Sequence, residues 1–314
     1  MKIRLGISTC LLGQPVRYDG GHKLDRFLTE TLGQYVEYVP VCPEVECGMP
    51  VPREPMHLEG SIESPRLVTI KTAIDKTDQM IGWAEKRVLE LENEKLMGFV
   101  FKSDSPSSGM ERVKVYSGKN VATRKGVGLF ARLFMQHFPL LPVEEEGRLH
   151  DPALRENFIE RVFALARWRE LMDGNESVRS LIEFHTKHKL LILSHSTKHY
   201  QEMGRLVGNA RKVPLQKLLQ DYQEQFMQAL KLRATPKKNV NVLLHMAGYF
   251  KTMLSSGEKA ELLEIIELYR KTLVPLIVPI TLVNHYVRKY SQPYLEDQFY
   301  LHPHPVEMAL RNHV

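Results

Sequence analysis

The chain has 314 residues, of which 43% are hydrophobic and 25% are charged, and its net charge is +6. These values are ordinary for a folded globular protein with two domains. No run of about 18 apolar residues is present, which excludes a typical membrane-spanning helix. The first residues, MKIRLGIST, contain no apolar signal core. We therefore expect a cytoplasmic protein whose thiols stay reduced.

The basic excess lies entirely in the second half of the chain. Residues 151–314 hold 23 Lys and Arg against 17 Asp and Glu, whereas residues 1–150 hold 20 of each. Positive charge gathered on one domain suits a polyanion such as RNA. The excess is modest, however, and many proteins that never contact nucleic acid carry as much.

Residues 1–145 alternate short apolar runs with helical patterns, which predicts an α/β domain with an open, mostly parallel sheet. Long polar loops follow the runs, and loops held on a rigid sheet are where sites are usually found. The predicted strands are Ile3–Ser8, Val36–Cys42, Arg66–Lys71, Met97–Lys102 and Arg112–Tyr116, and the predicted helices cover about residues 23–33, 75–95 and 126–138.

All three cysteines lie in the first fifty residues, next to predicted strands. Cys10 ends IRLGISTC, Cys42 ends YVEYVPVC, and Cys47 follows in CPEVECG. Open α/β sheets gather their ligands at strand ends. Three thiolates can hold an iron–sulfur cluster and leave one iron without a protein ligand, as in a catalytic centre. The alternative is three buried cysteines that act as small hydrophobic residues, because no complete C-x-x-C pair is present.

Two glutamates accompany the second and third cysteines. Glu44 stands two residues after Cys42, and Glu46 is directly beside Cys47. A carboxylate next to a metal site can move protons for a bound substrate or water. Glu44, between Pro43 and Val45 at a strand end, is the better candidate, and the alternative is a solvated loop glutamate.

The loop in FKSDSPSSGMERVKVY places a lysine and several hydroxyl groups at another strand end. These groups suit an anion, a polar heterocycle or a sulfur ligand, although Ser-Pro-Ser-Ser-Gly is also ordinary turn chemistry. The residues concerned are Lys102, Ser103, Ser105, Ser107 and Ser108.

The first loop offers Arg17, Tyr18 and Asp19. An aromatic ring beside an arginine can stack on a nucleobase and hydrogen-bond it. The alternative is a type I turn in which Tyr18 packs on the sheet.

The composition changes around Pro142–Pro152, where Asp151 can cap a helix that has Pro152 at its first position. We place the domain boundary here, with domains at residues 1–147 and 148–314. The second domain is predicted to be all-α. Its helices are expected at about residues 152–172, 176–193, 195–208, 214–233, 237–256, 258–272 and 274–290.

A histidine stripe occurs in FHTKHKLLILSHSTKHY of the second domain. His188, His195 and His199 share one helix face, with His185 close beside them. One alternative is that the histidines and three nearby lysines form a surface that binds phosphates or bases. The lysines are Lys187, Lys189 and Lys198. A metal site made of these histidines would need a further ligand, and the segment offers no cysteine or clear carboxylate for it. The favoured interpretation is that the histidines cap, pack or hydrogen-bond between helices.

Three blocks of the first domain resemble the signature blocks of the TudS-type thiouracil desulfidases, and they occur in the same order. They are GISTCLLGQPVRYDGGHK, PVCPEVECGMPVPR and KSDSPSSGMERVKVY. The segment LIEFHTKHKLLILSHSTKHYQEMGRLVG resembles the YbgA family. A chain that joins the two resembles the fused desulfidases that act on 4-thiouridine in tRNA. The resemblance implies a [4Fe–4S] cluster on three cysteines, whose free iron takes the thiocarbonyl sulfur without net redox change.

The chain departs from the commoner pattern at two positions. Relatives often have Cys where this chain has Val16, and many have Cys where it has Ser108. Cys47 then remains as the third thiolate, and the alternative is a site that has been altered and impaired. A serine alkoxide at Ser108 is a poor ligand for an iron–sulfur centre.

The favoured hypothesis is a cluster-dependent enzyme that desulfurates a thiolated pyrimidine, with tRNA as the expected carrier. Cys10, Cys42 and Cys47 hold the metal in this hypothesis, and Glu44, Ser103 and Ser105 are catalytic. The helical domain binds RNA through Lys187, Lys189 and Lys198. Free thiouracil is the alternative substrate, and a non-catalytic RNA-binding protein with structural zinc or no metal is the alternative class. The expected substrate-binding residues are Arg17, Tyr18, Asp19, Arg53, Lys102 and Ser108.

Overall fold

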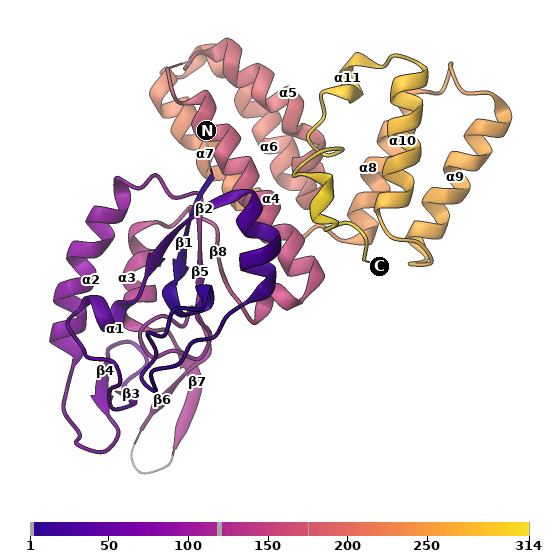
Figure 1. Cartoon of the computed structure of the whole chain (residues 1–314). Coiled ribbons are helices and arrows are strands. Elements are labelled where there is room, and N and C mark those ends of the chain that lie inside the picture. The colour runs from indigo at the N-terminus through magenta and orange to yellow at the C-terminus, as the bar shows by residue number, and fades with distance from the viewer. Residues whose placement is uncertain (1–2, 118–120, 175, 314) are drawn as a thin grey trace. The chain divides into compact units, whose positions relative to one another are not determined.

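The computed structural model describes residues 3–117, 121–174 and 176–313. It divides into two compact units, Met1–Asp151 and Pro152–Val314, which we call the first unit and the helical unit (Figure 1). In the described part of the chain, no helix is both long and apolar enough to cross a membrane.

The first unit contains a parallel sheet whose strands run in the order β2-β1-β5-β8. This arrangement confirms the predicted α/β class. Strand β5 is buried along its whole length, and its Phe99 packs on Phe134 of α3 with 4.7 Å between ring centroids. Helix α3 packs against α2 (Figure 1). The elements are β1 (Ile3–Ser8), β2 (Val36–Val41), β5 (Gly98–Phe101), β8 (Val143–Glu145), α2 (Thr77–Glu92) and α3 (Leu129–His137).

A second, mixed sheet was not predicted. It has the order β4-β3-β6-β7, with β3 and β6 parallel and the other two pairs antiparallel. The predicted strands at 66–71 and 112–116 form here rather than in the parallel sheet. The strands are β3 (Met56–Gly60), β4 (Pro65–Thr69), β6 (Val113–Tyr116) and β7 (Ala122–Gly126).

The segment predicted as a helix at 23–33 is shorter and irregular. It forms a π-helical turn at Phe27–Thr31 and then a 3₁₀ turn at Leu32–Gln34. A four-residue helix, α1 (Pro43–Glu46), begins directly after Cys42, because Pro43 favours the first helical position.

The helical unit confirms the predicted all-α domain. Serine and threonine side chains cap several of its helices; for example, Ser196 accepts from the His199 amide at the start of α6, and Thr235 accepts from the Lys238 amide at the start of α8. The helices are α4 (Pro152–Leu171), α5 (Val178–His195), α6 (Thr197–Gly208), α7 (Leu215–Lys231), α8 (Pro236–Tyr249), α9 (Ser256–Arg270), α10 (Ile277–Lys289) and the short α11 (Pro293–Glu296).

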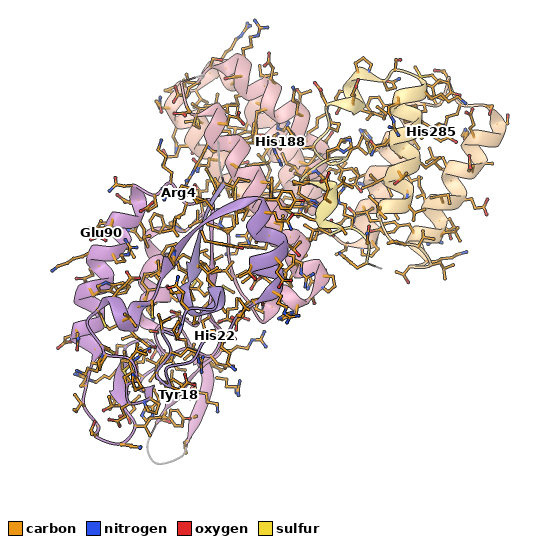
Figure 2. All side chains as sticks on the ribbon, viewed as in Figure 1. Arg4, Tyr18, His22, Glu90, His188 and His285 are labelled. Carbon is orange, nitrogen blue, oxygen red and sulfur yellow. The ribbon has the colours of Figure 1, made fainter. Side chains whose placement is uncertain are left out.

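The histidine stripe serves packing and hydrogen bonding, as the favoured interpretation held. His188 is fully buried within the helical unit (Figure 2), where it accepts from Arg167 and stacks on Phe184. His185 contacts the Tyr222 hydroxyl at 3.2 Å, and His195 contacts the Leu232 carbonyl at 2.6 Å. His199 contacts the Ser196 hydroxyl at 2.8 Å, so each of the four histidines packs or hydrogen-bonds within the helical unit.

Candidate active site

A cavity of about 600 Å³ lies at the carboxyl ends of the parallel strands. The register pairs Ser8 of β1 with Val41 of β2, so the segments that follow these strands emerge side by side. Segments after β1, β2 and β5 line the cavity. In the sheet, β2 lies on one side of β1 and β5 lies on the other, so the strand order reverses at β1. Ligands of such sheets usually bind at the carboxyl ends of the strands where this reversal occurs.

Cys10 and Cys42 both line this cavity. Cys10 lies in the tight turn after β1, which ends at Gly13 with a φ of 85°, a conformation that favours glycine. Burial raises the pKa of the Cys10 thiol to about 11, although the Lys102 ammonium opposes the shift, and burial also raises the pKa of Cys42. The two thiols are therefore protonated at neutral pH, and a metal that bound them would displace these protons.

Burial raises the pKa of the Cys47 thiol, and Cys42 is near enough to contribute to this shift, but Cys47 does not lie on the cavity wall that Cys10 and Cys42 share. Its side chain is outside the set of described residues that line the cavity, and it packs against the core cluster that contains Met49, Leu58 and Met80. Its Sγ lies 3.3 Å from the Glu44 carbonyl oxygen, one turn earlier in the chain. The role of Cys47 as third ligand stays a prediction, and Ser108, which lines the cavity and is 3% exposed, is the better placed group.

Glu44 lies on the cavity wall at the start of α1, where two neighbours fix its carboxylate. Ser107 donates to Oε1 at 2.9 Å, and the Nε of Arg53 donates to Oε2 at 2.8 Å. A second nitrogen of the Arg53 guanidinium also contacts Oε2, and both side chains of this pair are largely buried. The carboxylate is held in one orientation and its charge is balanced, so it is well positioned for proton transfer.

Arg53, which was expected to bind substrate, lines the cavity, and its guanidinium also makes hydrogen bonds within the protein. It donates to the Val16 carbonyl at 3.1 Å as well as to Glu44, and the Arg53 amide donates to the Tyr18 carbonyl at 2.8 Å. Arg53 thus joins the loop after β1 to the loop after β2, and in this arrangement it positions Glu44.

The serine loop is held rigidly over the first turn of α3. The Ser107 carbonyl accepts from the Phe130 amide at 3.0 Å, and Gly128 lies so close that a Cβ there would come within 2.6 Å of the Ser107 carbonyl. The Oγ of Ser105 accepts from the Ser108 amide at 3.0 Å. The structure therefore gathers the predicted serines, Ser103, Ser105, Ser107 and Ser108, on one wall with Lys102.

Glu146 is a residue that we did not predict. It follows β8, and the pairing of Phe101 with Glu145 brings it beside the end of β5. Its carboxylate accepts from the Ser103 hydroxyl and the Ser103 amide, both at 2.7 Å, and forms an ion pair with Lys102. The sequence signal was the run of three glutamates in PVEEEG, which we interpreted as part of the domain boundary.

The first loop contributes two of its three predicted residues to the cavity. Arg17 and Tyr18 line it, with the Arg17 guanidinium 5.4 Å from the Tyr18 ring centroid, and Tyr18 is 41% exposed (Figure 2). Asp19 does not line the cavity. Its carboxylate accepts from the Gly21 amide, which lowers the pKa of Asp19, and pairs with Arg17.

The three lysines predicted to bind RNA lie on α5 and α6 of the helical unit. Lys187 pairs with Asp297 at 3.3 Å, Lys189 lies 4.7 Å from the Tyr294 ring centroid, and Lys198 pairs with Glu202 at 3.9 Å. Such partly exposed pairs contribute little free energy, so the lysines remain available for a stronger anion.

Comparisons with known proteins match both units. Residues 5–146 match the model of the 2-thiouracil desulfurase family, and residues 189–305 match a family described as a protein of unknown function, DUF1722. Over 156 residues the chain is 31% identical to the uncharacterized protein YbgA of Escherichia coli. This match covers 48% of this chain and 90% of YbgA. A solved structure of the [4Fe-4S]-dependent thiouracil desulfidase TudS shares 31% identity over 49% of this chain and 98% of that chain, with a TM-score of 0.41. The 2-thiouracil desulfurase match supports a desulfidase enzyme.

Proposed function

We propose a function for this chain from two facts: it belongs to the family of the Escherichia coli protein YbgA, and its residues 5–146 match the 2-thiouracil desulfurases. The proposed reaction is the hydrolytic, non-redox removal of sulfur from a thiolated pyrimidine. Water supplies the oxygen, the ring C=S becomes C=O, and sulfur leaves as hydrogen sulfide. The preferred substrate is 4-thiouridine in tRNA, which becomes uridine.

The observation that carries the proposal is the meeting of Cys10, Cys42 and Glu44 in one cavity. The two thiols, the Ser108 hydroxyl and the volume of about 600 Å³ fit a [4Fe–4S] cluster of the kind on which TudS depends. Cys10 and Cys42 would hold it, and Ser108 lies in the third place on the same wall, where its hydroxyl is a weaker ligand for iron than a thiolate. When bound, the cluster supplies an iron atom as Lewis acid for the substrate sulfur.

The residues of the chain supply the proton chemistry. Glu44 takes a proton from the water that attacks the ring carbon, while Ser107 and Arg53 keep its carboxylate in place. Lys102, held by Glu146 and Ser103, offers positive charge near the departing sulfur. Tyr18 at the cavity mouth provides an aromatic face for the pyrimidine ring.

The full chain, reconstituted anaerobically with iron and sulfide, is the protein to assay. It should release hydrogen sulfide from tRNA that contains 4-thiouridine faster than from free 2-thiouracil, and the iron-free protein should release none. Sulfide release and loss of the thiocarbonyl absorbance are the measurements. A fully loaded protein that releases sulfide from neither substrate would overturn the proposed function.

The helical unit is proposed to bind the RNA backbone. Neutralising Lys187, Lys189 and Lys198 together should weaken tRNA binding and flatten its salt dependence, since each phosphate contact contributes about 0.7–0.9 to the slope of log K against log salt. The measurement is tRNA affinity at several salt concentrations, with the exposed pair Lys251 and Lys259 neutralised as the control. An unchanged slope in the triple variant would remove these lysines from the RNA surface.

A further inference from the structure

A second cavity, of about 370 Å³, lies within the helical unit. It is bounded by the first half of α4, the start of α8, the end of α9 and His313. Much of its wall is apolar, and a few polar groups converge on it, which is typical of small-molecule sites. The apolar wall is formed by Ala153, Ala234, Pro236, Val274 and Leu276.

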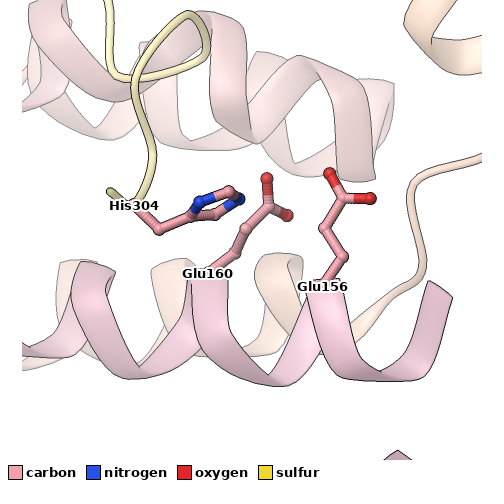
Figure 3. A group of neighbouring side chains, drawn as sticks. All are labelled: Glu156, Glu160 and His304. Atoms are coloured by element: carbon pink, nitrogen blue, oxygen red, sulfur yellow. The ribbon is translucent and has the colours of Figure 1, made fainter. Parts of the chain in front are cut away.

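Two glutamates one turn apart on α4, Glu156 and Glu160, form part of the cavity floor. Figure 3 shows both rising from the same face of α4, with Glu160 next to His304, and the ligand atoms of the three residues lie within 4.8 Å of one another. The guanidinium of Arg311 already bridges the two carboxylates, at 2.9 Å from Glu156 and 2.8 Å from Glu160. Because arginine supplies the balancing charge, this cluster is a structural ion-pair network rather than a metal site.

The floor also presents a hydrogen-bond donor near an acceptor. Tyr269 is 5% exposed, and its hydroxyl oxygen accepts from the Asn239 amide nitrogen at 3.0 Å. The hydroxyl hydrogen has no acceptor among the described residues. Each oxygen of Glu156 accepts one hydrogen bond, from Arg311 or from His313, so lone pairs remain. The Glu156 charge is near enough to help burial raise the pKa of Tyr269.

The rim of this cavity is positive. Arg233 is exposed at the rim, and no acidic side chain in the described part of the chain pairs with it. Thr235 and Pro236, at the amino end of the 14-residue helix α8, lie beside it, and helix amino ends attract anions. The cavity thus combines an apolar slot, a donor and an acceptor at its floor, and a cation at its mouth.

We propose that this cavity binds a nucleotide, either a free ribonucleoside monophosphate or an unpaired nucleotide of an RNA. The base lies in the apolar slot, where its edge meets the Tyr269 hydroxyl and the Glu156 carboxylate. Nucleobase edges present an acceptor beside a donor, which complements this pair. The phosphate lies at Arg233 and the start of α8. The inference stands on the helical unit alone and does not depend on the proposed desulfidation.

The experiment is a calorimetric titration of the full chain with UMP, CMP, AMP and GMP, each compared with ribose 5-phosphate and inorganic phosphate. At least one nucleotide should bind with a Kd of about 1 mM or tighter. Ribose 5-phosphate should bind at least tenfold more weakly than that nucleotide. Binding of no nucleotide, or equal binding of ribose 5-phosphate, would overturn the proposal.

Two variants locate the binding. Arg233→Ala, at an exposed position, should weaken binding of the nucleotide about tenfold and flatten its salt dependence, and Tyr269→Phe should weaken it about fivefold. Lys212→Ala, at an exposed position of the same unit, is the matched control. If both variants bind like the unaltered chain, the nucleotide occupies another site and the proposal fails. Tighter binding of a uridine hexanucleotide than of UMP, lost in the same variants, would identify RNA as the source of the ligand.

Discussion

The Cys42→Ser protein, reconstituted anaerobically, is expected to form no [4Fe–4S] cluster and to lose more than about 100-fold of its desulfidase activity. Cys42 directly follows β2 and lines the cavity with Cys10, so its loss leaves one thiol at the site. Residues that merely support a metal ligand already cost about 10- to 100-fold when replaced, and a ligand itself should cost more. Iron content, visible absorbance and sulfide release are the three measurements.

Cys47→Ser is the matched control, because it removes a thiol five residues away that packs against the core cluster. We expect this variant to keep its iron to within about twofold, since cluster ligands must reach the metal directly. Ser108→Cys should retain more iron than the unaltered chain, because thiolate is the better ligand at that wall. If Cys47→Ser loses iron as completely as Cys42→Ser, Cys47 is the third ligand that the sequence predicted.

Glu44→Gln should keep the cluster and lose about 10²- to 10⁴-fold in kcat, the usual contribution of a general acid–base group. The amide keeps the shape of the side chain and can still accept from Ser107, but it cannot take a proton from water. Because the substitution also removes the charge that pairs with Arg53, the thermal stability of the variant should be measured together with kcat. The measurements are single-turnover sulfide release and iron content across pH 6–8.

Glu46→Gln provides the comparison for this variant. Glu46 lies two residues further along, pairs with Arg87 and lies outside the set of described residues that line the cavity. Its Oε1 accepts from the Cys42 amide at 2.7 Å, and glutamine keeps an oxygen that can accept this bond. The Glu46→Gln variant should keep kcat to within about threefold. A large loss of kcat in Glu44→Gln then results from a change in the cavity and not from a change in α1. An unchanged kcat in Glu44→Gln would reduce Glu44 to a partner of Arg53.

The sequence predicted the parallel strands well, because their local patterns agree with their long-range pairing. Ile3–Ser8 is apolar and is followed by turn residues, and the strand has those same bounds. Val143–Glu145 was missed because two of its three residues are acidic, and it becomes a strand only by pairing with β5, which lies more than forty residues earlier. Pairing of this kind is set by tertiary contacts, which local propensity does not contain.

The same limit applies to the candidate site. Residues directly after strands, such as Cys42 and Lys102, were placed correctly because the direction of a parallel strand fixes where its carboxyl end lies. Cys47 lies outside the described lining of the cavity, because a helical turn separates it from β2 and sequence spacing gives distance without direction, and its role as a ligand stays a prediction. Glu146 escaped notice because its partners, Lys102 and Ser103, lie more than forty residues away.

The bonds of Arg53 have a consequence for any attempt to redesign the cavity. This one side chain joins the Val16 carbonyl to Glu44, and Glu44 in turn receives the hydroxyl of Ser107. Three loops that are far apart in the chain are therefore mechanically linked. A loop transplanted alone from a homologous protein would bring in one end of this linkage without the other. Libraries that seek a new substrate range should exchange the three loops as a set and leave Arg53 unchanged.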